Sequence, residues 1–451
     1  MDTVDAMTMK MDSYQDSSSS LSPFTYEESL LERCVLSLPL PDGEPHGDQA
    51  DWQSQEHPCL VLFNQHAKHY HNRREEKMHS RLPTFLENAR LVYETNRAQG
   101  SYRLALNQFS DRFPHELPSS AIPLDTTPQG NGNTFPARWL NDTEAVHQLA
   151  RETIHNPQQR RLQQPQTVTL DELHVDAPNQ NVYATVSTSS SSSSSAAHKD
   201  EIGETPAADS TVWDAFPPAF ATHLNWATTM NPDGVSIVSP PPQQGTCGAC
   251  WAFVATGTLE ANIARRQAYL SAVNSSSSTT PWKQRQIERL AMIPLSVQQL
   301  LDCDTAHNRG CMGGNPVFAF PFIHEHGLTT ARKYPYLGFQ GAFCRTEPTV
   351  AKVETWGLVP PRAPEMMELV LQHIGPIAVG LNVADPTFLQ YRTGIYDSLS
   401  CQQQSANHAV IIVGYGQEQI PITTASGTPS TETVSAQGNS CLYRLPVVSQ
   451  T

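Results

Sequence analysis

The sequence predicts an α+β protein, and three segments carry that prediction. Between residues 59 and 96, apolar residues recur at helical spacing in a context rich in charged side chains. A second helix is expected to begin at Cys250, where the apolar run of residues 251–260 starts. Residues 408–416 begin with a histidine, continue as a β-branched apolar run and end in a Gly-Tyr-Gly turn. This last pattern is typical of a buried strand with His408 at its head.

Composition limits the classes of protein that the chain can represent. Its 451 residues are 38% hydrophobic and include 35 prolines, which predicts one well-formed core together with long unstructured stretches. The net charge of −15 lies almost wholly in the first half, since residues 216–451 hold about 13 basic and about 14 acidic side chains. Without a basic stripe we expect no nucleic-acid partner, and without an apolar run of about 18 residues we expect no membrane span.

Four regions follow from changes in composition along the chain. Residues 1–55 are acidic and serine-rich, and we expect them to be disordered. Residues 56–113 carry the helical pattern, which Pro83 should kink or break. Residues 114–211 are rich in proline, glutamine, threonine and serine and are interpreted as a low-complexity linker. Residues 212–451 hold the motifs that carry chemistry.

Cys250 is the candidate nucleophile. At the first turn of a helix, a thiol feels the partial positive charge of the helix N-terminus, which favours the reactive thiolate. The side-chain amide of Gln244 lies six residues upstream and could donate a hydrogen bond to a developing oxyanion, beside the Cys250 backbone N–H. His408 is the candidate base, because the end of a buried strand holds a side chain rigidly. Covalent acyl transfer needs these three functions.

These segments resemble those of a known family. The stretch 243–253, with Cys247, Cys250 and Trp251, and the stretch 407–416 resemble the cysteine and histidine segments of papain-like cysteine proteases of the cathepsin type. The 4-3-4-4 spacing of one set of residues resembles the long helix of the family's inhibitory propeptide; its members are Arg81, Phe85, Asn88, Val92 and Asn96. The stretch 106–111 resembles the short strand that follows this helix.

The resemblance implies a fold and a reaction. The fold would have two lobes, a helical left lobe carrying Cys250 and an antiparallel, β-barrel-like right lobe carrying His408, preceded by a helical inhibitor prodomain. The reaction would be endopeptidase hydrolysis of polypeptide substrates through a thioester, by a monomer made as an inactive zymogen and needing no cofactor or metal. Its own prodomain would act as an intramolecular inhibitor, and we hypothesise that acid triggers release because the pro half is acidic.

The resemblance also assigns roles to other residues. Nine cysteines include seven in the second half, which fits three bridges and one reactive thiol. The family's pairing would join Cys247 to Cys311, Cys303 to Cys344, and Cys401 to Cys441. The residues implied to line the substrate cleft are Gly248, Gly313, Gly314 and Ala409. Gly313 and Gly314 would leave room for an extended substrate backbone.

One part of the family pattern is missing. After Gly416 the family continues with a strand and an Asn-Ser-Trp segment whose asparagine orients the histidine, but residues 417–438 are rich in threonine, serine and proline, without a strand pattern. Asn439 is a poor substitute. We favour a faulty gene model or splice form of an active protease. The alternatives are an active enzyme with an unusual third residue and a pseudoenzyme that binds or inhibits proteases.

Two further questions concern metal binding and compartment. A zinc module built on Cys247, Cys250, Cys303 and Cys311 is a rival hypothesis, disfavoured by the eight-residue step between the last two. Disulfides imply an oxidising compartment, so we expect a lysosomal, vacuolar or extracellular protein. The start of the chain shows no signal peptide, which leads us to expect that its true start differs. A cytosolic protein with free thiols is the alternative.

Overall fold

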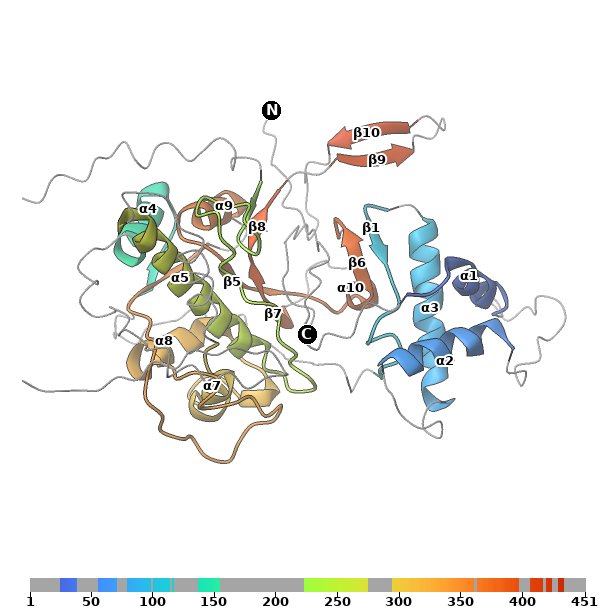
Figure 1. The fold of residues 1–451 in the computed structure, drawn as a ribbon, viewed down its shortest axis with the longest axis horizontal. Helices are drawn as coiled ribbons and strands as arrows, with labels where there is room; N and C mark the ends of the chain where they lie inside the picture. Colours follow the sequence, from blue (N-terminus) through green and yellow to red (C-terminus); the bar gives the residue numbers. More distant parts are fainter. Residues whose placement is uncertain are drawn as a thin grey trace, which may run out of the picture.

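The computed structural model describes parts of the expected prodomain, of the expected peptidase region and of the segment between them (Figure 1). The described residues are 25–38, 56–70, 79–98, 100–113, 116, 137–154, 223–274, 294–360, 363–396, 406–416, 419–423 and 429–433. Within this part of the chain, no helix is both long and apolar enough to span a membrane.

Three helices form the prodomain: α1 (Glu28–Leu36), α2 (Pro58–Tyr70) and α3 (Leu82–Arg97). A disulfide between Cys34 and Cys59 ties α1 to α2, and both cysteines are fully buried. The expectation of disorder throughout residues 1–55 was therefore wrong for α1. Its buried face, which includes Leu30 and Leu31, packs on the other two helices and was hidden from sequence reasoning by the short length of the helix.

Helix α3 explains the spaced residues of the prodomain motif. Phe85 and Val92 are fully buried, as their spacing predicted. Asn88 donates to the carbonyl of Ser110 at 2.9 Å, and Asn96 donates to the carbonyl of Leu104 at 2.9 Å. The two asparagines thus tie the chain that follows the helix back onto it. Pro83 lies in the first turn of α3, where proline is tolerated. The proline therefore marks the start of this helix and interrupts the helical pattern, as predicted.

The peptidase region has a helical lobe and a lobe that contains the strands. The left lobe comprises α5 (Cys250–Asn274), α7 (Val297–Cys303), η8 (Gly310–Met312) and α8 (Pro316–His326). The right lobe comprises β3 (Leu224–Asn225), β4 (Trp356–Leu358), α9 (Pro364–His373), β5 (Ile377–Leu381), α10 (Pro386–Leu389), β6 (Tyr391–Gly394), β7 (His408–Ile412) and β8 (Gly414–Tyr415). Its described strands pair two by two, including β5 with β7 and β3 with β8, both antiparallel.

Two regions contain regular structure where none was expected. In the predicted linker, β2 (Ala137–Trp139) pairs in parallel with β4, and α4 (Thr143–Thr153) packs against α9. After residue 416, β9 (Gln419–Thr423) and β10 (Pro429–Thr433) form an antiparallel hairpin. In β9, Ile420 and Ile422 lie two residues apart, a short strand signal that Pro421 between them and the polar residues around them obscured. Figure 1 shows this hairpin apart from the other sheets.

The prodomain is joined to the peptidase region by a strand pair. Strand β1 (Tyr102–Leu104) pairs antiparallel with β6. Neutral groups extend this seam through five hydrogen bonds. Two join Ser101 and Ile395, from Ile395 N–H to Ser101 O at 2.8 Å and from Ser101 Oγ to Ile395 O at 2.7 Å. The others run from Ala105 N–H to Gln390 O at 2.8 Å, from Asn107 Nδ2 to Leu389 O at 2.7 Å, and from Ser110 Oγ to Gln390 Oε1 at 2.7 Å. One buried apolar cluster also runs from the prodomain helices to β7.

Gly394 provides a test of this seam. Its φ is +94°, and a Cβ atom there would lie 2.4 Å from Ser101 O and 2.8 Å from Tyr102 Cα. We expect Gly394→Ala to separate β1 from β6, because the new methyl group meets backbone that cannot move aside. Hydrogen exchange of the Ile395 amide should then lose protection. Gly338→Ala is the matched control, since its φ is +76° with nothing within 4 Å. Equal protection of Ile395 in both variants would contradict the prediction.

Candidate active site

Cys250 and His408 are each the first residue of a long buried element. Cys250 begins α5 and His408 begins β7. About two turns into the helix, Gly257 faces β7 so closely that a Cβ atom there would lie 2.8 Å from Ile411 Cδ1. The absence of a side chain at 257 therefore lets the helix lie directly on the strand.

A second contact gives the relative direction of the helix and the strand. Later in α5, the Arg265 guanidinium lies 4.4 Å over the ring of Trp226, whose backbone N–H donates to Val413 O at 2.8 Å. Later residues of α5 thus meet the residues that follow β7, so both elements run in the same direction. Cys250 and His408 accordingly lie at the same end of the pair.

The environments of the two side chains differ. Cys250 is buried at the N-terminus of a 25-residue helix, whose dipole favours a thiolate, and it forms no disulfide in the described structure. His408 is 7% exposed, and burial lowers its pKa from 6.5 to about 4. This environment favours the neutral imidazole, which can accept a proton. It does not favour the imidazolium, because burial penalises the charged form.

Gln244 is held on the segment that precedes α5. Its Nε2 donates to Cys247 O at 2.7 Å, while Tyr336 donates from its hydroxyl to Gln244 O at 2.7 Å. An amide nitrogen carries two hydrogens, so one is left for a further acceptor. Burial raises the pKa of Tyr336 to about 12, which keeps this hydroxyl a donor. Nothing in the sequence singled out Tyr336 as the support of Gln244.

The glycines of the predicted substrate wall are held by a buried polar chain. Asp304 accepts from Asn308 Nδ2 at 2.7 Å, and Asn308 Oδ1 accepts from Asn315 N–H at 2.7 Å. A Cβ atom on Gly314 would lie 2.4 Å from Asn308 Oδ1 and 2.8 Å from the Trp251 ring. Packing therefore requires glycine at 314. This requirement adds to the one expected from the sequence, that glycine leaves room for a substrate backbone. Nothing in the sequence singled out Asn308.

All four residues predicted to line the substrate cleft are buried in this structure: Gly248, Gly313, Gly314 and Ala409. Gly313 has a φ of 108°, and Gly248 N–H donates to Cys311 O at 2.9 Å, which joins the wall to the cysteine segment. Ala409 lies opposite Gly380 in the β5–β7 pair. Their contact with substrate stays a prediction.

The disulfides decide between two readings of the cysteines. Cys247 is bonded to Cys311 and Cys303 to Cys344, as the family resemblance implied. The predicted pair of Cys401 and Cys441 lies outside the described residues, as does Asn439. Three of the four proposed zinc ligands are thus consumed in disulfides, which removes the zinc hypothesis. Among the described residues, no cluster of three potential ligands could hold a metal.

Asp304 makes the stability of this wall depend on pH. Burial raises the pKa of its carboxyl group from 3.8 to about 6. The folded state therefore binds this proton more tightly than the unfolded chain does, and the charged form weakens the fold as pH rises from about 4 to above 6. We expect Asp304→Asn to raise the free energy of unfolding by about 2 kcal/mol at pH 7, and to change little below pH 4.

Denaturant unfolding at both pH values measures this effect. Glu325→Gln is the control, because it removes the charge of an exposed carboxylate in α8, the helix that follows the wall. The explanation fails if Asp304→Asn loses stability at pH 7, or if both variants behave alike.

Comparison with known proteins agrees with this geometry. Residues 221–280 and 269–430 match the papain family of cysteine proteases, and residues 63–117 match the cathepsin propeptide inhibitor domain. The chain belongs to the papain family of cysteine proteases and carries a cathepsin-type propeptide, which confirms the expected family and fold.

The similar proteins extend over part of the chain. Cathepsin R of Mus musculus is 35% identical over 182 residues, covering 40% of this chain and 48% of that protein. Testin-2 of Rattus norvegicus is 37% identical over 188 residues, covering 41% and 49%. The chain thus matches about half the length of these relatives. The structure of procathepsin L2 from Tenebrio molitor superposes with a TM-score of 0.51 at 20% identity, covering 83% of this chain and 88% of that one, and shows the same fold.

Proposed function

We propose that this chain is a cysteine endopeptidase made as a zymogen, with Cys250 as nucleophile, His408 as base and Gln244 as oxyanion donor. The observation that carries the proposal is the parallel run of α5 and β7, with a cysteine at the start of one and a histidine at the start of the other. The helix N-terminus favours the thiolate, and the neutral imidazole of His408 can take the thiol proton.

The reaction would proceed in two stages. The thiolate of Cys250 attacks the peptide carbonyl carbon, and the oxyanion accepts hydrogen bonds from Gln244 Nε2 and the Cys250 N–H. When the C–N bond breaks, the imidazolium of His408 gives its proton to the leaving amine. Water then attacks the thioester with the imidazole as base and releases the carboxylic acid and the thiol.

The prodomain is proposed to restrain the enzyme until it is removed. The β1–β6 pair and its neighbouring hydrogen bonds hold it on the peptidase. Because these described hydrogen bonds are all neutral, acid would act inside the prodomain. There Arg81 pairs with Glu116, bonded at 2.7 Å from Nη1 to Oε2, and lies 5.2 Å from the Phe113 ring centroid. Protonating Glu116 would remove this pair and loosen the segment that leads away from the prodomain.

The disulfides support a proposal about the cellular compartment in which the protein acts. The bridges Cys34–Cys59, Cys247–Cys311 and Cys303–Cys344 are of the kind formed on the secretory route, and cathepsin relatives point the same way. We propose a lysosomal, vacuolar or extracellular site of action on polypeptides.

A non-catalytic role as a protease-binding protein is the second candidate, favoured by one observation. Residues 417–438 contain neither asparagine nor tryptophan, so the family's third catalytic residue has no counterpart there. Such a protein would bind another papain-like protease through its prodomain helices.

Alkylation combined with a peptide assay separates the two candidates. After the prodomain is removed at pH 5 under mildly reducing conditions, we expect hydrolysis of a fluorogenic peptide. One equivalent of iodoacetamide should add at Cys250 and stop it. The proposal is wrong if the processed protein labels at Cys250 but never hydrolyses peptide. The rival gains support if the unprocessed chain then inhibits papain, and if Cys250→Ala inhibits equally well.

A further inference from the structure

We propose that residues 137–154, which form β2 and α4, are a permanent part of the peptidase body and stay bound to it when the prodomain is separated. The segment lies in sequence between the prodomain and the peptidase region, where a linker was predicted. In the structure it packs on β4 and α9 of the right lobe. The inference concerns which parts of the chain the mature protein contains, and it stands whether or not that protein is catalytic.

Backbone pairing provides the first support. Strand β2 lies parallel to β4 with Ala137 opposite Trp356 and Trp139 opposite Leu358. The N–H of Leu140 continues the pairing by donating to Leu358 O at 2.9 Å. Among the described strands, β2 is the only one that pairs with β4. Loss of the segment would leave the backbone of β4 without this partner.

Gly357 provides the second and most specific support. A Cβ atom at this position would lie 2.4 Å from Leu140 Cδ1 and 2.7 Å from Leu149 Cδ2. Its backbone is not in the left-handed region that favours glycine, so conformation does not require glycine there. The missing side chain is instead explained by the two leucines that occupy its place. The peptidase strand is therefore shaped to receive this segment.

An apolar cluster provides the third support. Its buried members are Leu140, Val146, Leu149 and Ala150 of the segment, and Val370 and Ile374 at the end of α9. Leu149 and Ala150 lie three and four residues after Val146, so these three residues of α4 share one face of the helix. Asp142 caps the helix by accepting from Ala145 N–H at 2.8 Å, while Gln148 on the other face is exposed. The helix is thus amphipathic and buries its apolar side on α9.

The position of the segment makes its retention compatible with loss of the prodomain. Figure 1 shows α4 beside α9, on the opposite side of the molecule from α1, α2 and α3. The seam between prodomain and peptidase involves β1, β6 and the neighbouring residues, none of which belongs to the apolar cluster under α4. Opening that seam leaves the contacts of α4 intact.

The test cuts the chain on both sides of the segment. A recognition sequence for one highly specific protease is inserted within residues 117–136 and again within residues 155–222, in a Cys250→Ala background that removes self-cleavage. After cutting at low micromolar concentration, gel filtration and mass spectrometry identify which fragments elute together. We expect the fragment containing residues 137–154 to elute with the peptidase. Elution as a free peptide would overturn the proposal, and neither result depends on catalytic activity.

Two variants of α4 check that the described contacts hold the fragment. Val146→Asp places a charge in the buried cluster, and Gln148→Asp places the same charge on the exposed face of the same helix. The fragment should separate from the peptidase in the first variant and stay bound in the second. Retention in Val146→Asp, or loss in Gln148→Asp, would show that the described packing does not hold the segment.

Discussion

Replacing Cys250 by alanine is expected to remove peptide hydrolysis altogether, and replacing Gln244 by alanine is expected to lower kcat about 100-fold with little change in KM. Both follow from the proposed function. Alanine at 250 has no nucleophilic atom. Loss of the Gln244 amide removes one donor to the oxyanion, and such donors act on the transition state more than on bound substrate, typically by 10²–10³ in kcat.

The neighbouring glutamine offers the control for this experiment. Gln243 has the same side chain but is exposed, whereas Gln244 is buried. Gln243→Ala should therefore keep the kcat of the parent. Because Gln244 also donates to Cys247 O, the thermal midpoint of each variant is measured alongside kcat and KM. A rise in KM with unchanged kcat in Gln244→Ala would place this residue in substrate binding and contradict its role as oxyanion donor.

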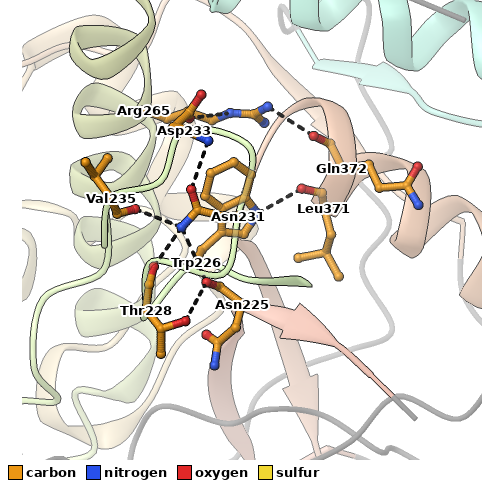
Figure 2. Close-up of polar contacts among 9 residues, drawn as sticks. All are labelled: Asn225, Trp226, Thr228, Asn231, Asp233, Val235, Arg265, Leu371 and Gln372. Atoms are coloured by element: carbon orange, nitrogen blue, oxygen red, sulfur yellow. Dashed lines mark hydrogen bonds and ion pairs between the residues drawn. The ribbon is translucent and has the colours of Figure 1, made fainter. Parts of the chain in front are cut away.

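Replacing Arg265 by leucine is expected to lower the free energy of unfolding by about 3–5 kcal/mol. Figure 2 shows Arg265 between the loop after β3 and the end of α9. Its Nη2 donates to Gln372 O at 3.0 Å, and its Nε lies 3.6 Å from the Asp233 carboxylate. Burial lowers the pKa of Arg265 to about 10 and raises that of Asp233, so each charge depends on the other to remain ionised. Leucine would leave the partly buried Asp233 carboxylate without its cation.

A double-mutant cycle separates the ion pair from the rest of the contact. Asp233→Asn combined with Arg265→Leu leaves no buried charge, so its loss should be smaller than the sum of the single losses. Arg265→Lys keeps the charge but not the planar contact with Trp226, and it should fall between the parent and Arg265→Leu. Denaturant unfolding measures the parent and these four variants. Additive losses would mean that the pair is not coupled.

The network around Arg265 shows why this loss should be large. Asn231 donates from Nδ2 to Thr228 O at 2.7 Å and Val235 O at 2.8 Å, and its Oδ1 accepts from Asp233 N–H at 3.0 Å (Figure 2). The Trp226 indole donates to Leu371 O at 2.8 Å. This loop therefore joins α5 to α9, and the same contacts hold α5 in line with β7.

The sequence was sufficient to predict the parts of the molecule in which local pattern and chemistry coincide. Cys250 at a helix start and His408 at a strand start were predicted from apolar runs whose periods match their elements. Ser296 caps α7 in the same local way, since its Oγ accepts from Gln299 N–H at 3.0 Å. In each case, a short stretch of chain contains the whole physical cause.

Elements stabilised by distant contacts were the ones that sequence reasoning missed. Helix α1 depends on a disulfide between Cys34 and Cys59, and α4 on a face of α9 more than 200 residues away in the chain. Hydrophobic composition averaged over their surroundings could not reveal either, because both lie in polar stretches. The supporting roles of Asn308 and Tyr336 were missed for the same reason, since each acts through a neighbour that only folding provides.

The seam at β6 has one more consequence. Among the described strands, β6 has β1 as its only partner, so departure of the prodomain leaves a strand edge with unsatisfied backbone groups. Such edges recruit other extended chains, and natural proteins blunt them with charge or turns. Arg392 and the left-handed Gly394 lie within this strand. Both residues would interrupt pairing along this edge. The surface that departure of the prodomain exposes is therefore poorly suited to self-association.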